Sequence, residues 1–152
     1  MREIILFLLF FGFSAQAKSQ QAEDSIKAVV HGLFNAMKAA DSAKIISLFS
    51  ENAVLQTVGR YNEGLTIVKD EQVSNFGASV AAAKPGDLDE WATIEVLKID
   101  GDLAMVWTPY NFYYKGHFLH CGVNSFQLVR LGGQWKIQYL IDTRRKAPCK
   151  PL

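Results

Sequence analysis

The segment that decides the fold is LAMVWTPYNFYYKGHFLHCGVNSFQLVRLGGQWKIQYLIDTR, which runs from Leu103 to Arg144. It contains three long runs rich in aromatic and β-branched residues. Two short glycine-containing turns, Lys115-Gly116 and Gly132-Gly133, join these runs. Glycine in a two-residue turn between such runs is the usual signature of a β-hairpin. The segment therefore predicts an antiparallel meander of three strands.

The two turns also predict the register of the strands, because a two-residue turn fixes which residues face each other. A similar turn at Asp100-Gly101 extends this register to the strand upstream. A shift of one residue would move every side chain to the opposite face, so each expected pair is a specific prediction. The expected pairs are Asn111 with His120, Trp107 with Asn124, Phe126 with Tyr139, and Val96 with Met105.

One face of the expected sheet is heavy and aromatic, so it is expected to face a layer of helices. In this register it carries a compact polar group between aromatic side chains. Buried polar groups without partners cost on the order of 1–3 kcal/mol each, so a group of this kind favours a ligand pocket. A cross-strand pair of Asn111 and His120 that satisfies itself is the alternative. The expected ligand-binding residues are Trp107, Asn111, His120, Asn124 and Tyr139.

The opposite face of the expected sheet is too apolar for a simple solvent-facing surface. Large exposed apolar patches usually mark association, so the pattern predicts a homodimer through this outer face. The alternative is that polar neighbours make the patch tolerable in a monomer. The residues of the expected patch are Val106, Tyr110, Phe112, Leu119, Val123, Val129 and Leu140.

Helices are expected before the meander, because apolar residues repeat there at helical spacing. Asp24 or Ser25 is a credible N-cap of the first helix, and Asp41 is one of the second. Helices first and strands afterwards predict an α+β domain with its helices on one sheet face. The expected helices span 24–40, 42–49 and 70–80, and short strands are expected at 53–58, 65–68 and 91–99.

The N-terminus has the layout of a secretory signal peptide. A short charged start precedes the apolar run Ile4 to Phe13, and Ser14-Ala15-Gln16-Ala17 supplies a small-residue cleavage site. We expect cleavage after Ala17, which leaves one domain at 18–152, exported to the periplasm or secreted. An uncleaved N-terminal anchor is the alternative. No other segment is expected to cross a membrane.

Charge and cysteine content narrow the classes of partner. The net charge of +1 argues against a nucleic-acid surface. Three histidines in different elements form no metal signature, so neither a metal nor another cofactor is expected. Cys121 and Cys149 can form a disulfide in an oxidising compartment, and two free thiols are the alternative.

The chain resembles the nuclear-transport-factor-2-like superfamily, also called SnoaL-like. The resemblance rests on Ala40-Asp41 leading into residues 45–55, and on the closing hairpin at 131–137. Residues 120–123 with 142–145 look most like its lumazine-binding branch. The resemblance implies a cone-shaped α+β fold, a curved sheet wrapped round three helices, a pocket inside the cone and frequent dimerisation through the sheet.

Function within this superfamily depends on what titrates inside the cone, because isomerases and dehydratases need a general acid or base there. In the expected register the inner face has no Asp or Glu, Asp142 falls on the outer face, and only His120 titrates near neutrality. Asp70 or Glu71 from the helix side, or Glu63 in the loop, can still reach inward. The favoured function is an exported small-molecule-binding protein. The alternatives are an isomerase or dehydratase with His120 as acid and base, and a dimeric protein-interaction module.

Overall fold

The computed structural model describes residues 2–61 and 64–152, with side chains from residue 19 onward except Tyr61. Three helices and seven strands lie in this part of the chain. The helices are α1 (Arg2–Ala39), α2 (Ser42–Leu48) and α3 (Val73–Ala81). The strands are β1 (Phe49–Tyr61), β2 (Leu65–Glu71), β3 (Leu88–Ala92), β4 (Val96–Asp100), β5 (Leu103–Tyr114), β6 (His117–Leu131) and β7 (Gln134–Thr143).

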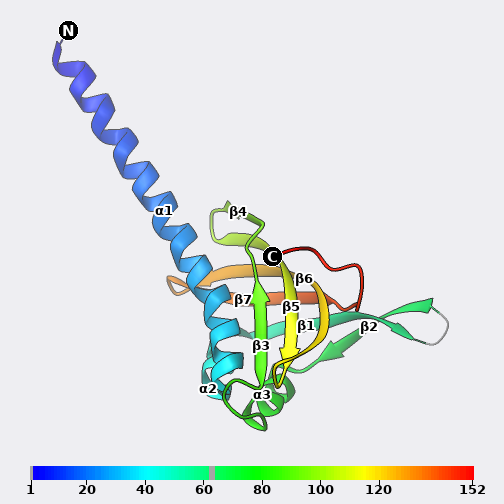
Figure 1. Cartoon of the computed structure of the whole chain (residues 1–152). Coiled ribbons are helices and arrows are strands. Elements are labelled where there is room, and N and C mark those ends of the chain that lie inside the picture. Colours follow the sequence, from blue (N-terminus) through cyan, green and yellow to red (C-terminus); the bar gives the residue numbers. More distant parts are fainter. Residues whose placement is uncertain (1, 62–63) are drawn as a thin grey trace.

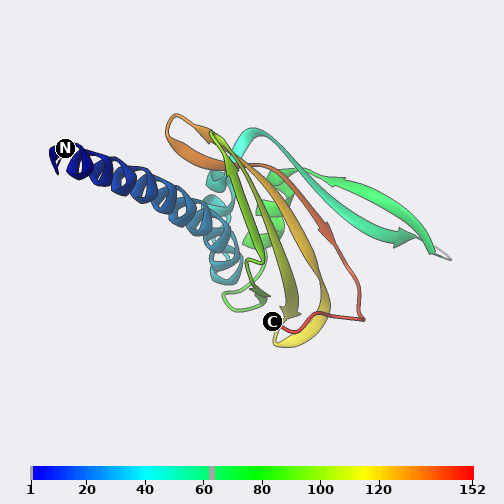
Figure 2. The same ribbon diagram turned by 90° about the horizontal axis from the view of Figure 1, so that it is seen from above.

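The strands form one curved, unclosed sheet with the order β2-β1-β7-β6-β5-β3, and β4 also pairs with β5. The helices lie against the concave face of this sheet, which we call the inner face (Figures 1 and 2). The expected α+β class, with helices packed on a curved sheet, is confirmed. One pairing differs from the expected antiparallel pattern, because β1 runs parallel to β7.

The apolar stripe of α1 supplies much of the core. Ile26, Val30 and Leu33 are almost completely buried, and Phe34 packs edge-on against Phe126 of β6. The helix passes through Asp24 without a break, so the expected start at that residue is wrong. The expected cap at Asp41 is confirmed, since its side chain accepts a 2.8 Å hydrogen bond from the backbone N–H of Lys44.

The β5–β6 register agrees with the expected one only next to the turn. Tyr114 pairs with His117 as expected, but a bulge leaves Leu119 without a partner. From there on the strands are shifted by one residue, so the expected pairing of Asn111 with His120 is wrong. Asn111 lies opposite Cys121, and Phe112 lies opposite His120. The shift turns Trp107 and Asn111 to the outer face and brings Tyr110 and Phe112 inside.

A second bulge shifts the β6–β7 hairpin in the same way. The pairing of Leu131 with Gln134 is as expected, but Gln138 has no partner in β6. Phe126 therefore lies opposite Leu140, and the expected pairing with Tyr139 is wrong. Asp142, expected on the outer face, lies opposite Asn124 on the inner face.

The turn before β5 is also displaced by one residue. Asp100 pairs with Leu103, so the two loop residues are Gly101 and Asp102. Gly101 has a φ of +58° and takes the first central position, where hairpin turns favour glycine. Val96 consequently pairs with Trp107 instead of Met105.

The expected outer apolar patch does not exist as one surface. Val106, Tyr110 and Leu140 are buried on the inner face, because the bulges reversed their direction. Apolar side chains that remain exposed on the outer face include Val54, Leu103 and Trp107. The C-terminal segment doubles back across this face (Figure 2), and a disulfide joins Cys149 to Cys121 of β6.

The side chains of the predicted signal peptide, residues 1–17, are not among those that the structure describes. Cleavage after Ala17 stays a prediction. None of the described helices combines the length and the apolarity that a membrane crossing requires.

Candidate functional site

A cavity of about 280 Å³ lies between the helices and the inner face of the sheet. Most of its wall is apolar and comes from α1, α3 and the strands. The apolar residues are Leu33, Phe34, Met37, Leu55, Phe76, Val80, Leu88, Phe112 and Leu140. Such a wall with a few converging polar groups is the usual composition of a small-molecule site.

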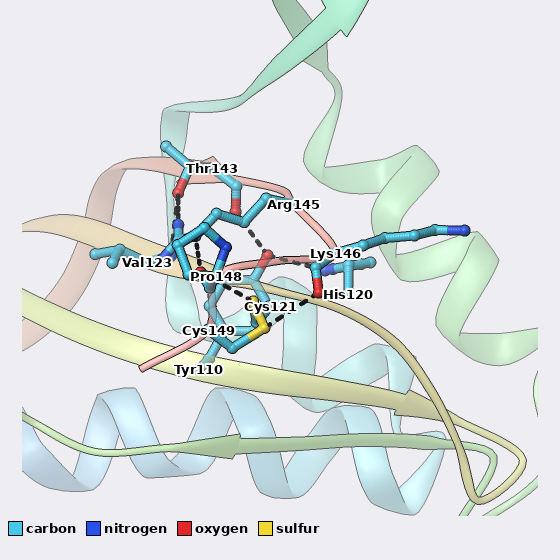
Figure 3. Close-up of a disulfide and its surroundings, with 9 residues drawn as sticks. All are labelled: Tyr110, His120, Cys121, Val123, Thr143, Arg145, Lys146, Pro148 and Cys149. Carbon is cyan, nitrogen blue, oxygen red and sulfur yellow. Dashed lines mark hydrogen bonds between the residues drawn. A yellow bond between two sulfur atoms is a disulfide. The ribbon is translucent and has the colours of Figure 1, made fainter. Parts of the chain in front are cut away.

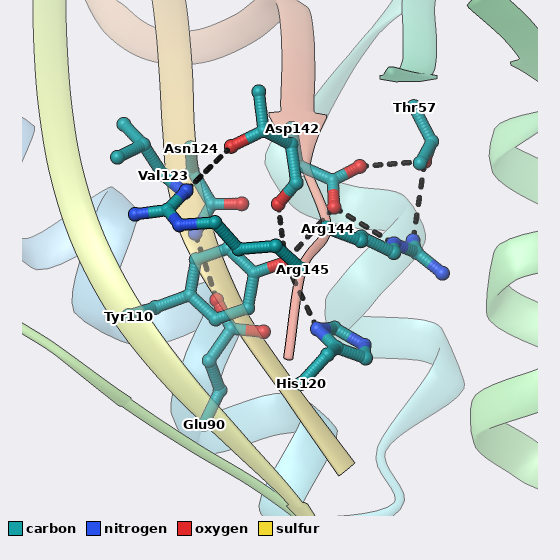
Figure 4. Close-up of polar contacts among 10 residues, drawn as sticks. Thr57, Glu90, Tyr110, His120, Val123, Asn124, Asp142, Arg144 and Arg145 are labelled. Carbon is teal, nitrogen blue, oxygen red and sulfur yellow. Dashed lines mark hydrogen bonds and ion pairs between the residues drawn. The ribbon is translucent and has the colours of Figure 1, made fainter. Parts of the chain in front are cut away.

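The polar end of the cavity is centred on the hydroxyl group of Tyr110. This hydroxyl lies 3.0 Å from Oδ2 of Asp142, 3.0 Å from the carbonyl oxygen of Thr143 and 3.2 Å from Nδ1 of His120. Figure 4 shows the side chains converging on Tyr110 from different strands of the sheet. Burial, together with the charges of Asp142 and Glu90, raises the pKa of Tyr110, so the hydroxyl keeps its proton at neutral pH.

Gly122 makes this arrangement possible. The carbonyl oxygen of Thr143 lies only 1.7 Å from the point that a Cβ at Gly122 would occupy, and the Tyr110 ring lies 2.8 Å from it. The backbone N–H of Val123 donates to the Thr143 hydroxyl at 3.2 Å, so the carbonyl of Thr143 is available to Tyr110. A larger residue at position 122 would displace either Thr143 or Tyr110.

Asp142 is held by partners on three strands or their ends. Thr57 of β1 donates to Oδ1, while Tyr110 and the Nε of Arg144 donate to Oδ2, the latter at 2.8 Å. Arg144 also donates to the Thr57 hydroxyl at 3.1 Å. The Asp142 carboxyl group is buried, and these donors supply the hydrogen-bond partners that its buried oxygens need.

Glu90 of β3 reaches the same end of the cavity from the opposite side. The side-chain amide of Asn124 donates a 2.7 Å hydrogen bond to its Oε1. Surrounding protein raises the pKa of Glu90 from 4.5 to about 7 by burial, and the hydrogen bond from Asn124 only partly opposes this. Near neutral pH the Glu90 carboxyl is therefore present in both protonation states, which suits it to give or take a proton.

His120 completes the polar group. Burial and the charge of Arg144 lower its pKa, so the imidazole is neutral at pH 7. The Tyr110 hydroxyl has one proton, which it shares between Oδ2 of Asp142 and the carbonyl oxygen of Thr143. We therefore assign the Nδ1 proton to His120 as the donor to Tyr110. This tautomer leaves the lone pair on Nε2 of His120. The ring stacks on Phe112 with centroids 5.1 Å apart.

Two of the five expected ligand-binding residues, His120 and Asn124, line the cavity. The other three lie on the outer face, for the reason given by the two bulges. Trp107 is 38% exposed there, Asn111 lies opposite Cys121, and the Tyr139 hydroxyl donates to Gln56. The structure thus does not bring the expected set together.

Sequence reasoning missed five polar residues of the cavity: Ser79, Glu90, Tyr110, Asp142 and Arg144. Tyr110, Asp142 and Arg144 were misplaced or missed because the bulges changed which residues of β5 and β7 face inward. The inner face thus has carboxylates, and the contrary expectation is wrong. Of the carboxylates expected to reach inward, Glu71 lines the cavity and Asp70 lies outside it. Glu63 is not among the residues that the structure describes.

Glu71 and Arg144 also line a neighbouring hollow of about 500 Å³ beside the β1–β2 hairpin and the start of α3. The polar end of the cavity therefore adjoins the surface at these two residues. Within the described part of the chain, no three His, Cys, Asp or Glu side chains are grouped closely enough to hold a metal ion.

Comparisons with known proteins agree with this architecture. A family model described as a SnoaL-like domain matches residues 19–141. An NTF2-like protein of unknown function from Silicibacter pomeroyi superposes with a TM-score of 0.66 at 18% identity, covering 84% of this chain and 98% of that one. A candidate dehydratase of the NTF2-like family from Streptomyces avermitilis gives a TM-score of 0.65 at 15% identity, with coverages of 84% and 99%. No curated protein gives a match.

Proposed function

Because the chain belongs to the SnoaL-like domain family, and because its cavity gathers titratable groups, we propose that it binds a small, largely apolar molecule and catalyses proton transfer on it. The observation that carries this proposal is the polar end of the cavity. There Glu90, His120 and Asp142 surround one buried tyrosine, opposite an apolar wall. Isomerisation and dehydration are the reactions that such groups serve.

Glu90 and His120 are the two groups that would contact the substrate. Glu90 exchanges a proton near neutral pH, because burial raises its pKa to about 7. His120 accepts a proton on Nε2 while its Nδ1–H stays on Tyr110. Asp142 stabilises the imidazolium through the Tyr110 hydroxyl, since both groups share that hydroxyl. One group can thus remove a proton while the other supplies one.

The size of the cavity limits the substrate. A volume of about 280 Å³ suits a molecule with one or two rings. Aromatic and aliphatic side chains contact its apolar part, and Asn124 offers an amide oxygen beside Glu90. The resemblance of residues 120–123 and 142–145 to the lumazine-binding branch supports including flat, partly polar heterocycles among the candidates.

The proposal is tested by a thermal-shift screen with a metabolite library that includes pteridines, flavins and hydroxylated or keto-substituted rings. A ligand at one hundred times its dissociation constant stabilises the fold by about 2.7 kcal/mol, which such a screen detects. Each hit is then incubated with the protein in D₂O, and proton NMR follows deuterium incorporation at the acidic C–H position. We expect exchange or turnover with the wild type, and at least a roughly hundredfold loss with Glu90→Gln or His120→Asn.

Glu95→Gln is the matched control, since Glu95 pairs with Lys150 on the surface and lies outside the cavity. A hit that binds without deuterium exchange would reduce the function to binding alone. A hit whose thermal shift survives Glu90→Gln together with Asn124→Ala would place the site elsewhere.

We also propose that the protein is exported. The layout of residues 1–17 and the disulfide between Cys121 and Cys149 support this, because such bonds persist in oxidising compartments. Expression of the full chain in a bacterium, followed by mass spectrometry of the periplasmic fraction, should find a protein beginning at Lys18. Recovery of the uncleaved chain from the cytoplasm alone would contradict export.

A homodimer through the outer sheet face remains a proposal, now with different residues. Val54, Leu103 and Trp107 are the exposed apolar side chains that support it, whereas Val123 is nearly covered. Sedimentation velocity of Trp107→Arg should show a shift from dimer to monomer. A wild type that sediments as a monomer at high concentration would exclude this interface.

A further inference from the structure

The C-terminal strap, residues 145–152, crosses the outer face of the sheet and is fastened at several points. Arg145 and Cys121 exchange backbone hydrogen bonds of 2.8 and 2.9 Å, and Cys149 is bonded to Cys121. Arg145 also closes the loop of the strap through its Nε, which donates to Pro148 at 2.7 Å. Figure 3 shows the strap folded over Cys121 in this way. Lys150 reaches Glu95, 2.9 Å away.

The strap is joined directly to the polar end of the cavity. Arg145 follows Thr143 and Arg144, whose carbonyl oxygen and guanidinium bind Tyr110 and Asp142 respectively. The pairing of Arg145 with Cys121 of β6 therefore decides where these two groups lie. The carbonyl oxygen of Thr143 packs directly against Gly122. A small movement of residues 143–145 therefore changes the contact between Thr143 and Tyr110.

The other end of the disulfide is equally close to the site. Cys121 lies between His120 and Gly122 on β6. The side chain of Cys121 therefore points to the outer face, whereas His120 and the free side of Gly122 face inward. Cys121 is 1% exposed beneath the strap. One covalent bond thus fixes both the segment that carries His120 and the segment that carries Arg144.

We propose that the strap is a redox-sensitive positioning element, in which the Cys121–Cys149 disulfide holds Thr143, Arg144 and His120 in their places around Tyr110. A dithiol reductant releases it. Its thiolate attacks the sulfur of Cys149, which is in the exposed strap, and Cys121 leaves as a thiolate. The second thiolate of the reductant then closes its own disulfide and frees Cys149, so the reductant loses two electrons and the protein gains them.

The test compares the oxidised protein, the same protein with dithiothreitol, and Cys149→Ala. Amide hydrogen exchange and the NMR titration of the His120 ring are measured for each, and neither needs a ligand. We expect the amides of Cys121 and Arg145 to exchange at least about tenfold faster after reduction, while those of Leu128 and Ile137 do not change. The midpoint of His120 should rise, because release of the strap lessens both burial and the influence of Arg144.

Lys150→Gln is the matched control, since it loses only the exposed ion pair with Glu95 and keeps the disulfide. His31 and His117 serve as internal references for the titration, as both are exposed. An unchanged His120 midpoint after reduction overturns the proposal. So does a uniform rise in exchange along β6 and β7, which would mean that the bond only stabilises the fold. Any effect of reduction on turnover rests on the proposed function. The hydrogen exchange and the His120 titration do not depend on that function.

Discussion

Asn124 of β6 and Glu90 of β3 are joined across β5 by a hydrogen bond of 2.7 Å. The two residues are not neighbours in the register, because Asn124 pairs with Thr108 while Glu90 pairs with Phe112. The bond therefore runs diagonally over the Tyr110 side of β5. It fixes one oxygen, Oε1, of a carboxyl group that lines the cavity.

Glu90→Gln should stabilise the protein at neutral and alkaline pH. The pKa of Glu90 is about 7 in the folded chain and 4.5 when unperturbed, so between these values the folded state binds the proton more tightly. Stability contributed by Glu90 is thus present below about pH 4.5 and is lost as the pH rises through 7. Because Gln keeps an acceptor for Asn124 and never ionises, the variant should gain about 1–3 kcal/mol above pH 7.

The measurement is urea unfolding of both proteins between pH 4 and pH 9. The difference in unfolding free energy should vanish at the acidic end and grow toward the alkaline end. Glu95→Gln, which alters an exposed carboxylate, should show no such pH dependence. A Glu90→Gln variant that is less stable at pH 8 than at pH 5, relative to the wild type, would show that the carboxylate form is the stabilised one.

Tyr110→Phe should destabilise the fold and disturb the site together. The change removes a buried hydroxyl that bonds Asp142, Thr143 and His120. The groups left unpaired should cost about 1–3 kcal/mol in urea unfolding. Tyr113→Phe, in the outer aromatic pair with Phe118, is the matched control and should have a much smaller effect. Equal losses for both variants would argue against a central role for Tyr110.

Gly122→Ala should be among the most damaging small substitutions in the chain. Its Cβ would lie 1.7 Å from a backbone oxygen, which cannot move away as a flexible side chain can. We expect a loss of about 1–3 kcal/mol or more by thermal unfolding, with a change in the His120 NMR signal. Gly59→Ala is the control, because nothing lies within 4 Å of the corresponding Cβ there. A fully stable Gly122→Ala variant would contradict the tight packing of Thr143.

Asp41→Ala should weaken the junction between α1 and α2. The Asp41 side chain accepts the backbone N–H of Lys44 at the start of α2. Loss of such a cap typically costs about 1 kcal/mol. Thermal unfolding should show this loss, while Asp24→Ala, within the continuous helix α1, should change stability little. A neutral Asp41→Ala variant would mean that packing alone places α2.

Much of the fold could be predicted from local patterns. The apolar stripe of residues 26–37 gave the packed face of α1, Asp41 gave the start of α2, and two glycine turns gave the β5–β6 and β6–β7 hairpins. These features depend on neighbours within a few residues, so the chain itself displays them. The pairs nearest to each turn, Tyr114 with His117 and Leu131 with Gln134, were accordingly right.

The candidate site could not be predicted in the same way. Leu119 and Gln138 each add one unpaired residue to a strand, and no turn or glycine marks them. Each bulge reverses the inside and outside of the residues beyond it. Asn111 and Tyr139, which were expected in the pocket, therefore lie on the outer face. Tyr110 and Asp142, which were expected on the outer face, line the cavity. Glu90 joined them through a strand whose exact limits the sequence did not show.

The sequence by itself determined the α+β class, the order of the elements and the packed face of the helix, because these follow from the period of apolar residues and from turn chemistry. The tertiary structure decided which side chains meet in the cavity. That choice depends on how the long strands curve round the helices, and the bulges at Leu119 and Gln138 are where the sheet departs from a regular register. This departure from a regular register forms the candidate site, since it places a neutral histidine and two carboxyl groups around Tyr110.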